Sequence, residues 1–176
     1  MTLQGTHICL RALEATDLDF LFNTENNELF WEISNTQLPF SKHILQRYIE
    51  QSHQDIYQAK QYRFVIGNTE GQPVGLIDLF DFDPHHHRAG VGILVLPKHQ
   101  QKGYGTEALK LLINYAFSYL NLHQLYANIS ADNLQSRALF EKYGFLERGC
   151  KKDWIYTRNT YKDEIFYQLV QPTDRS

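Results

Sequence analysis

A short glycine-containing segment that could hold a phosphate group follows the apolar run at residues 91–96. It consists of Gln100, Gln101, Lys102, Gly103, Tyr104, Gly105 and Thr106, and a helical pattern begins at Thr106 and runs to residue 120. Glycine adopts backbone angles that other residues resist and lets the chain approach a ligand closely. The first amides of a helix lack internal partners and favour an anion, and Lys102 adds a cation. The spacing predicts a phosphate cradle, with a plain surface turn as the alternative.

Two common nucleotide-binding motifs are absent from this segment. Its residues match neither the G-x-x-x-x-G-K-[S/T] loop of nucleoside triphosphatases nor the G-x-G-x-x-G turn of dinucleotide-binding folds. A phosphorylated ligand of another kind is therefore the expectation.

Length and composition limit the class of protein. A chain of 176 residues, 43% of them hydrophobic, predicts one globular domain over residues 1–176. The net charge of -3 gives no drive toward nucleic acid, and no stretch approaches the roughly 20 apolar residues of a membrane span. Two cysteines, Cys9 and Cys150, and an N-terminus without a long apolar core predict a protein of the reducing cytoplasm without a signal peptide.

The periodicity predicts alternating strands and helices around the glycine segment. Thr16 and Ser41 are predicted to cap two helices, and residues 25–39 are expected to be irregular. Strands are expected at residues 7–13, 62–67, 74–82, 88–96, 123–130, 145–154 and 161–170, and further helices at 106–120 and 133–143. The order predicts a single α+β domain.

A second motif gives the chain a family resemblance. Residues 133–145, with Asn133, Ser136, Phe140, Lys142 and the Gly-Phe pair that follows, resemble the N-x-x-S-x-x-x-[Y/F]-x-K-x-G-F signature of GCN5-related N-acetyltransferases (GNAT). Residues 100–105 resemble the [R/Q]-x-x-G-x-[G/A] acetyl-CoA loop of that family. The two motifs lie one helix and one strand apart, as in the family. Within it, residues 25–27, 63–65, 87–89 and 121–126 look like the branch of spermidine and ribosomal-protein alanine acetyltransferases.

The resemblance implies a fold and a cofactor site. The expected fold is α+β, with a mixed, mostly antiparallel sheet of about seven strands flanked by about four helices. Acetyl-CoA is expected in the V between the strands at 88–96 and 123–130. Backbone groups of Ile93, Leu94 and Val95 should pair with the pantetheine, and the amides from Gln101 to Thr106 should hold the pyrophosphate. Asn133 and Ser136 should reach the pantetheine arm and Lys142 the phosphates, while a helix cap and a solvated helix face are the structural alternatives.

The reaction implied is attack of a neutral amine on the thioester, with departure of CoA thiolate. An alkylamine of pKa near 10.4 is only about a thousandth neutral near pH 7.4, so a base is valuable. Many relatives carry Glu where this chain has Gly90. Asp78 and Asp81, on the preceding strand, are the carboxylates that could serve as the base in place of that Glu. Their spacing puts them on opposite faces of a regular strand, and Asp81, nearer the turn, is preferred as the cleft residue; a solvated strand-end carboxylate is the alternative.

A second departure concerns the general acid. Many relatives have Tyr at the position of Phe140, where its hydroxyl protonates the leaving thiolate. Phe140 cannot donate a proton, but a thiol of pKa about 8.5 is a tolerable leaving group. Tyr143 is expected to have a core role instead. Because both departures touch the chemistry, an acetyl-CoA sensor without turnover stays open as one alternative.

The acceptor end is predicted from an acidic stretch. Glu25, Glu28 and Glu32 share one face if their stretch is helical, and would attract a cationic amine. Trp31 stands on the segment that covers the acceptor in the family, although a core position is the alternative. The expected acceptor is a small primary amine such as the polyamine spermidine. A protein N-terminus or lysine is the other acceptor class that remains open, as does the choice between monomer, homodimer and larger homo-oligomer.

No metal site is predicted. The consecutive histidines at 85–87 lie on a turn, where neighbouring side chains rarely aim at one ion, and no cysteine or carboxylate cluster completes a ligand set.

Overall fold

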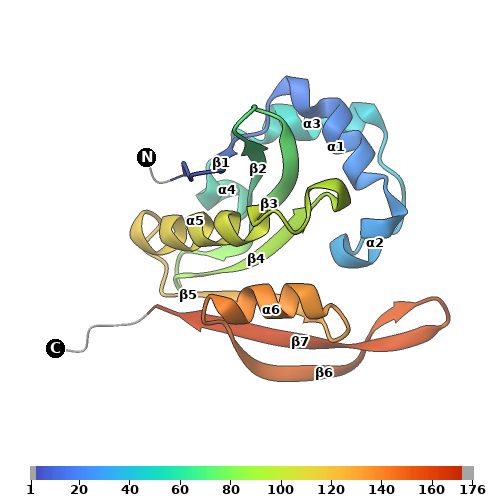
Figure 1. Cartoon of the computed structure of the whole chain (residues 1–176), viewed down its shortest axis with the longest axis vertical. Helices are drawn as coiled ribbons and strands as arrows, with labels where there is room; N and C mark the ends of the chain where they lie inside the picture. Colours follow the sequence, from blue (N-terminus) through green and yellow to red (C-terminus); the bar gives the residue numbers. More distant parts are fainter. Residues whose placement is uncertain (1–2, 172–176) are drawn as a thin grey trace.

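Seven strands form one sheet in a computed structural model that describes residues 3–171 (Figure 1). The spatial order is β1-β2-β3-β4-β5-β7-β6, and every neighbouring pair is antiparallel except β4 and β5, which run parallel. This confirms the predicted α+β class and mixed sheet. The strands are β1 (Ile8–Arg11), β2 (Tyr62–Asn68), β3 (Pro73–Asp83), β4 (Arg88–Val95), β5 (Gln124–Ser130), β6 (Leu146–Thr157) and β7 (Thr160–Val170).

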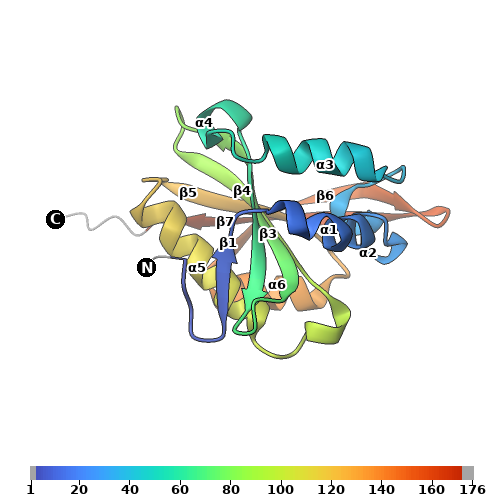
Figure 2. The same ribbon diagram turned by 90° about the horizontal axis from the view of Figure 1, so that it is seen from above.

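Helices cover both faces of the sheet. Figure 2 shows α5 and α6 on one side, and α3 and α4 on the other. None of the helices within residues 3–171 is long and apolar enough to cross a membrane. The helices are α1 (Leu18–Glu25), α2 (Glu28–Ser34), α3 (Lys42–Gln51), α4 (Ile56–Ala59), α5 (Tyr104–Ser118) and α6 (Leu134–Lys142).

Two of these helices were not expected from the sequence. The stretch predicted to be irregular contains α2, whose start is capped by the Asn27 side chain, which accepts a hydrogen bond from the amide of Leu29. The single turn of α4 is capped by Asp55 in the same way. Both helices are too short for a periodic pattern to stand out, and their caps are the signal that could have indicated them.

The predicted cap of the first helix was also wrong. A 3-10 turn (Ala15–Asp17) precedes α1, and Glu14, not Thr16, is its N-cap residue. Asp17 accepts a hydrogen bond from the amide of Glu14 at 2.8 Å and binds Arg11 through both carboxylate oxygens. The pair with Arg11 comes from β1, so a local capping rule could not have identified it.

Apolar side chains of α5 and of α1 and α3 fill the two sides of the sheet. The buried face of α5 contains Leu109 and Leu112, which are fully buried, and packs against strands β1 and β4. On the other side, Leu45 and Ile49 of α3 pack with Leu21 of α1 over β2 and β3. Burying each such side chain contributes about 1.5–3 kcal/mol, so both layers hold the central strands in place.

The parallel strands β4 and β5 separate part-way along their length. They pair only from Arg88–Gln124 to Gly90–Tyr126, although β4 continues to Val95 and β5 to Ser130. Beyond Gly90, the edge of β4 that faces β5 has no strand beside it. The predicted V is therefore present, and its mouth lies at the glycine segment.

Candidate active site

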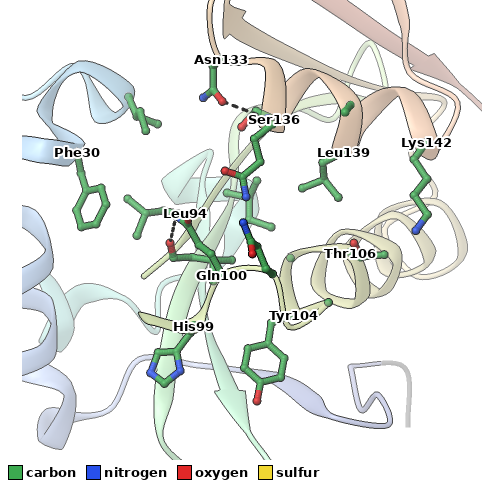
Figure 3. Close-up of a pocket in the computed structure, with 18 residues that line it drawn as sticks. Phe30, Leu94, His99, Gln100, Tyr104, Thr106, Asn133, Ser136, Leu139 and Lys142 are labelled. Carbon is green, nitrogen blue, oxygen red and sulfur yellow. Dashed lines mark hydrogen bonds between the residues drawn. The ribbon is translucent and has the colours of Figure 1, made fainter. Parts of the chain in front are cut away.

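The open end of the V is a hollow of about 380 Å³ between β4, the glycine segment, α5 and α6. Figure 3 shows Ser136, Leu139 and Lys142 of α6 on one side of it and Gln100 and Thr106 on the other. Of the fourteen residues predicted to bind the cofactor, twelve line this hollow. They are Ile93, Leu94, Val95, Gln100, Gln101, Gly103, Tyr104, Gly105, Thr106, Asn133, Ser136 and Lys142.

The glycine segment has the backbone geometry of a cradle. Gly103 is the N-cap of α5 with φ of 80°, and Gln101 also has a positive φ of 60°. A Cβ at Gly105 would lie 3.4 Å from Val95 Cγ2 and 3.7 Å from Leu139 Cδ2. The two glycines thus serve different purposes. Gly103 supplies a left-handed turn, and Gly105 leaves open the space between β4 and α6 in which an extended ligand fits.

The polar residues at the start of α6 form the cap of the helix and also line the larger hollow. The Asn133 side chain accepts a hydrogen bond from the amide of Ser136 at 3.1 Å, so it caps the helix. Asn133 also borders the hollow, which places the cap and the site at the same end of α6. On the opposite wall, Gln100 Nε2 donates to the carbonyl of Val95 at 3.1 Å and fixes the segment against β4.

Two predicted cofactor residues do not line the hollow. Lys102 is exposed on the loop. Phe140 is only 2% exposed, and its ring packs edge-on against Phe145 at 4.9 Å between centroids. The side chain therefore belongs to the core under α6. Lining residues that the sequence reasoning missed are Phe30, Ile33, His99, Gln135, Ala138 and Leu139.

A smaller hollow of about 90 Å³ adjoins the first. The two share Phe30 and Ile33 of α2 and Ile93 and Leu94 of β4, so they lie on either side of the same apolar wall. The polar lining of the smaller hollow consists mainly of Glu25, Arg63 and Asp78, with Thr24 and Ser34 beside them.

Arg63 joins the two carboxylates of this smaller hollow. Its Nε donates to Asp78 Oδ1 and its Nη2 donates to Asp78 Oδ2, each at 2.8 Å. Its Nη1 donates to Glu25. The ring of Tyr48 lies 5.7 Å from the guanidinium carbon. Burial alone would lower the pKa of Arg63, but the adjacent Asp78 outweighs it and raises the pKa above its ordinary value. The guanidinium stays charged, and the cluster carries one net negative charge.

The two aspartates of β3 occupy different sites. Asp78 lines the smaller hollow, whereas Asp81 lies at the end of the strand, where the register with β4 shifts. Asp81 has φ of 47°, and its carboxylate accepts a hydrogen bond from Tyr126 at 3.2 Å. The geometry therefore favours Asp78 over Asp81 as the carboxylate nearest the V. The opposite preference was based on the nearness of Asp81 to the turn, and at this end of the strand the positive φ of Asp81 interrupts the regular alternation of side chains.

The position of Gly90 is filled by a neighbouring ring. A Cβ built on Gly90 would lie 2.3 Å from Cε2 of Phe80, far inside van der Waals contact. Phe80 in turn packs edge-on against Tyr126, with centroids 5.7 Å apart. The aromatic ring of Phe80 on β3 thus occupies the space that a side chain at position 90 of β4 would need.

The predicted acidic stripe is not continuous. Glu25 ends α1 and turns inward to Arg63, and the break at Asn26 and Asn27 separates it from α2. Glu32 pairs with Lys162 at 2.7 Å, and Glu28 is exposed. Trp31 donates its indole N–H to the carbonyl of Glu25 at 2.9 Å and does not line either hollow. Its neighbour Phe30 faces the site instead.

Within residues 3–171, no three histidines, cysteines or carboxylates are grouped so as to hold a metal ion. His85 and His86 contact each other edge-on, and His87 Nδ1 lies 3.1 Å from the carbonyl of Asn121.

Comparison with known proteins gives the family. Residues 7–146 match the acetyltransferase (GNAT) domain. The chain is a GNAT acetyltransferase. Acetyl-CoA is accordingly the acetyl donor of this enzyme, and an amine nitrogen is the acceptor.

The curated relatives of this GNAT enzyme include polyamine and ribosomal enzymes. A spermidine N(1)-acetyltransferase of Vibrio cholerae is 28% identical over 170 residues, which cover 95% of each chain. The spermidine N(1)-acetyltransferase of Escherichia coli K12 is also 28% identical, over 92% of this chain and 85% of the relative. A putative ribosomal N-acetyltransferase of Bacillus subtilis, YdaF, is 32% identical over 58% of this chain and 56% of the relative.

Solved structures agree with this placement. The Vibrio cholerae spermidine N-acetyltransferase in complex with CoA and spermine superposes with a TM-score of 0.85 at 27% identity, over 93% of this chain and 95% of that one. A dodecameric structure of the Vibrio cholerae enzyme superposes with a TM-score of 0.79 at 28% identity, over 93% of this chain and 94% of that one.

Proposed function

We propose that this GNAT enzyme acetylates a primary amine of a slender cationic acceptor, with an alkyl polyamine such as spermidine as the acceptor class. The observation that carries the proposal is the smaller hollow, which shares a wall with the V and has one net negative charge. Its volume of about 90 Å³ suits an unbranched aminoalkyl end rather than a bulky group. The polyamine names of the relatives support the same acceptor class.

The residues of the larger hollow are assigned to acetyl-CoA. Backbone amides of the glycine segment and the start of α5 hold the pyrophosphate, and Lys142 adds positive charge. The pantetheine runs along the free edge of β4 at Ile93–Val95, opposite Asn133 and Ser136. This path leads the thioester to the wall shared with the smaller hollow.

The acceptor amine then attacks the thioester at the place where the two hollows meet. The amine nitrogen forms a bond to the thioester carbon and loses a proton, while the carbon–sulfur bond breaks and CoA leaves as a thiolate that is protonated by solvent. Both oxygens of Asp78 already accept hydrogen bonds from Arg63. We therefore assign Glu25 and Asp78 the task of attracting and holding the ammonium, and assign removal of its proton to water.

Release of CoA thiol with a panel of amines tests this function. Spermidine should support turnover, while an alanine-ending peptide and a lysine peptide should not. Asp78→Asn should raise the KM for spermidine and leave the Kd for acetyl-CoA unchanged. Asp19→Asn is a matched control, because Asp19 is exposed and pairs with Lys42 away from both hollows.

Each rival function has its own result in this assay. Turnover with a peptide and not with spermidine would make the enzyme a protein acetyltransferase. Tight acetyl-CoA binding without CoA release in the presence of any amine would make it a sensor.

Self-association is a further part of the proposal. The hairpin of β6 and β7 exposes Trp154, Tyr156 and Tyr161, each about 60% accessible. A dodecameric neighbour structure supports a homo-oligomer. Light scattering of the purified chain gives the assembly size, and a monomeric mass at all concentrations would contradict this part.

A further inference from the structure

A hollow beside Asp81 is separate from the two described above, and we call it the second hollow because it would be the second site for the acceptor. We propose that it is a cation subsite that holds the distal ammonium of the acceptor while the reacting amine lies beside Asp78. The inference rests on the proposed function and narrows the acceptor to an extended diamine or polyamine. The hollow has a volume of about 550 Å³ and is lined by side chains at the end of β3 and on β4, β5 and β7.

This hollow lies on the same face of the sheet as the smaller hollow beside Asp78, which is the proposed acceptor pocket. Asp78 and Phe80 are two residues apart on β3, so their side chains share a face. Phe80 contacts Tyr126, which lines the second hollow together with Phe166. An acceptor that starts beside Asp78 therefore reaches Asp81 without crossing the sheet.

The second hollow has the chemistry of an ammonium site. Asp81 carries an exposed carboxylate, whose hydrogen bond in the structure comes from the hydroxyl of Tyr126. Burial and the adjacent Asp81 raise the pKa of Tyr126 to about 12, so this hydroxyl stays protonated. The nearby charges Asp83 and Arg88 pair with each other at 3.3 Å, which leaves Asp81 as the source of net negative charge.

Aromatic rings complete the site. The ring centroids of Tyr126 and Phe166 lie 5.7 Å apart, and those of Phe80 and Tyr126 are equally close. The faces of such rings attract a cation through their negative electrostatic potential. The ring of Phe80, which covers Gly90 between the two aspartates, offers an apolar surface to the methylene groups of the acceptor.

The span between the two aspartates sets the length of the acceptor. Three residues of extended chain place the Cα atoms of Asp78 and Asp81 at most about 11 Å apart. Two ammonium groups joined by a chain of such length fit both carboxylates at once, whereas a monoamine of equal length fits only the first. The second contact lowers KM without a change in the chemical step.

Octanediamine and octylamine are the matched probes, because they differ only in the second ammonium. The wild-type enzyme should have the lower KM for octanediamine, by about fivefold if the contact is worth about 1 kcal/mol. Asp81→Asn should abolish this difference and leave the KM for octylamine unchanged. Asparagine also tolerates a positive φ, so the backbone of this variant is retained. Glu70→Gln, on the exposed turn between β2 and β3, controls for the loss of one charge.

The outcomes separate this inference from the proposed function. Equal KM values for the two probes, or a difference that survives Asp81→Asn, would overturn the second subsite while CoA release continued to support amine acetylation. No CoA release with either probe or with spermidine would remove the proposed function itself. The preference for octanediamine should also shrink as salt is added, since exposed charges are screened beyond about 8 Å at physiological ionic strength.

Discussion

The larger hollow, the proposed cofactor end of the V, and the smaller hollow, its proposed acceptor end, are built in different ways. The larger hollow takes its polar groups from two local motifs, the turn around Gly103 at the start of α5 and the cap formed by Asn133 at the start of α6. The acceptor pocket depends on Arg63, whose partners Glu25 and Asp78 stand 38 and 15 residues away. A motif can specify the first kind of site, whereas only the fold assembles the second.

The difference also concerns electrostatics. At the cofactor end, positive character comes from helix amides and from lysines that solvent surrounds. At the acceptor end, one guanidinium is held between two carboxylates with its side chain 23% exposed. A change at the acceptor end should therefore affect folding as well as binding.

The largest effect is expected from Arg63→Met. This change leaves Glu25 and Asp78 without their shared cation, and because the three side chains are partly buried the loss should reach at most about 3 kcal/mol. Urea unfolding measures the loss. Arg88→Met is the matched control, because its pair with Asp83 is more exposed and should be worth less than about 1 kcal/mol. Equal losses for the two variants would show that the acceptor end is no more coupled to folding than the surface.

Gly103→Val tests the cofactor end. Valine is strained at φ of 80°, although nothing lies within 4 Å of the position of its Cβ. The Kd for acetyl-CoA, measured by calorimetry, should rise tenfold or more, which is about 1.4 kcal/mol. Gly149→Val is the control, since that glycine also has open space but no positive φ. An unchanged Kd in a folded Gly103→Val enzyme would remove the loop from the site.

Phe140→Tyr asks whether the buried ring takes part in catalysis. The added hydroxyl should enter the core and reduce stability by about 1 kcal/mol, with turnover retained or raised. Phe40→Tyr, at a half-exposed position, should leave both unchanged. A large loss of kcat in the folded Phe140→Tyr variant would show that the reaction needs an apolar residue there.

The pair of Arg11 and Asp17 gives an acid-dependent effect away from both hollows. Burial would raise the pKa of Asp17, but hydrogen bonds from Arg11 and from the amide of Glu14 outweigh it and lower the pKa below its ordinary value. A lowered folded-state pKa stabilises the protein above the unfolded value of about 3.9, and this contribution is lost as pH falls through the folded pKa. Asp17→Asn should therefore be less stable than wild type at neutral pH, and the two stabilities should converge in acid. A constant gap at every pH would contradict this linkage.

The smallest effect is expected from Glu28→Gln with Glu32→Gln. Glu28 is exposed and Glu32 is already paired with Lys162, so their loss should change the KM for spermidine much less than Asp78→Asn does. A rise in KM equal to that of Asp78→Asn would restore the acidic stripe as the main attraction for the acceptor.

The sequence predicted the strands, the V and most of the residues that line the larger hollow, because these follow from alternation, glycine turns and the resemblance of two motifs to a family. It did not predict that Phe140 packs into the core, since a motif gives the position of a side chain and not its surroundings. It also preferred Asp81 to Asp78 because Asp81 is nearer the turn, and nearness to the turn does not reveal that the two aspartates line different hollows. The role of Arg63 was not visible at all, because its partners come from different elements.

The contact between Phe80 and Gly90 makes these two positions interdependent during divergence. A single change of Gly90 to a larger residue meets the ring of Phe80 at less than van der Waals distance, whereas loss of the ring first opens the space. An acidic residue at position 90 of β4 therefore requires the ring of Phe80 to move or to be lost. If the ring is lost first, the enzyme passes through a sequence that has neither the aromatic ring at position 80 nor a carboxylate at position 90.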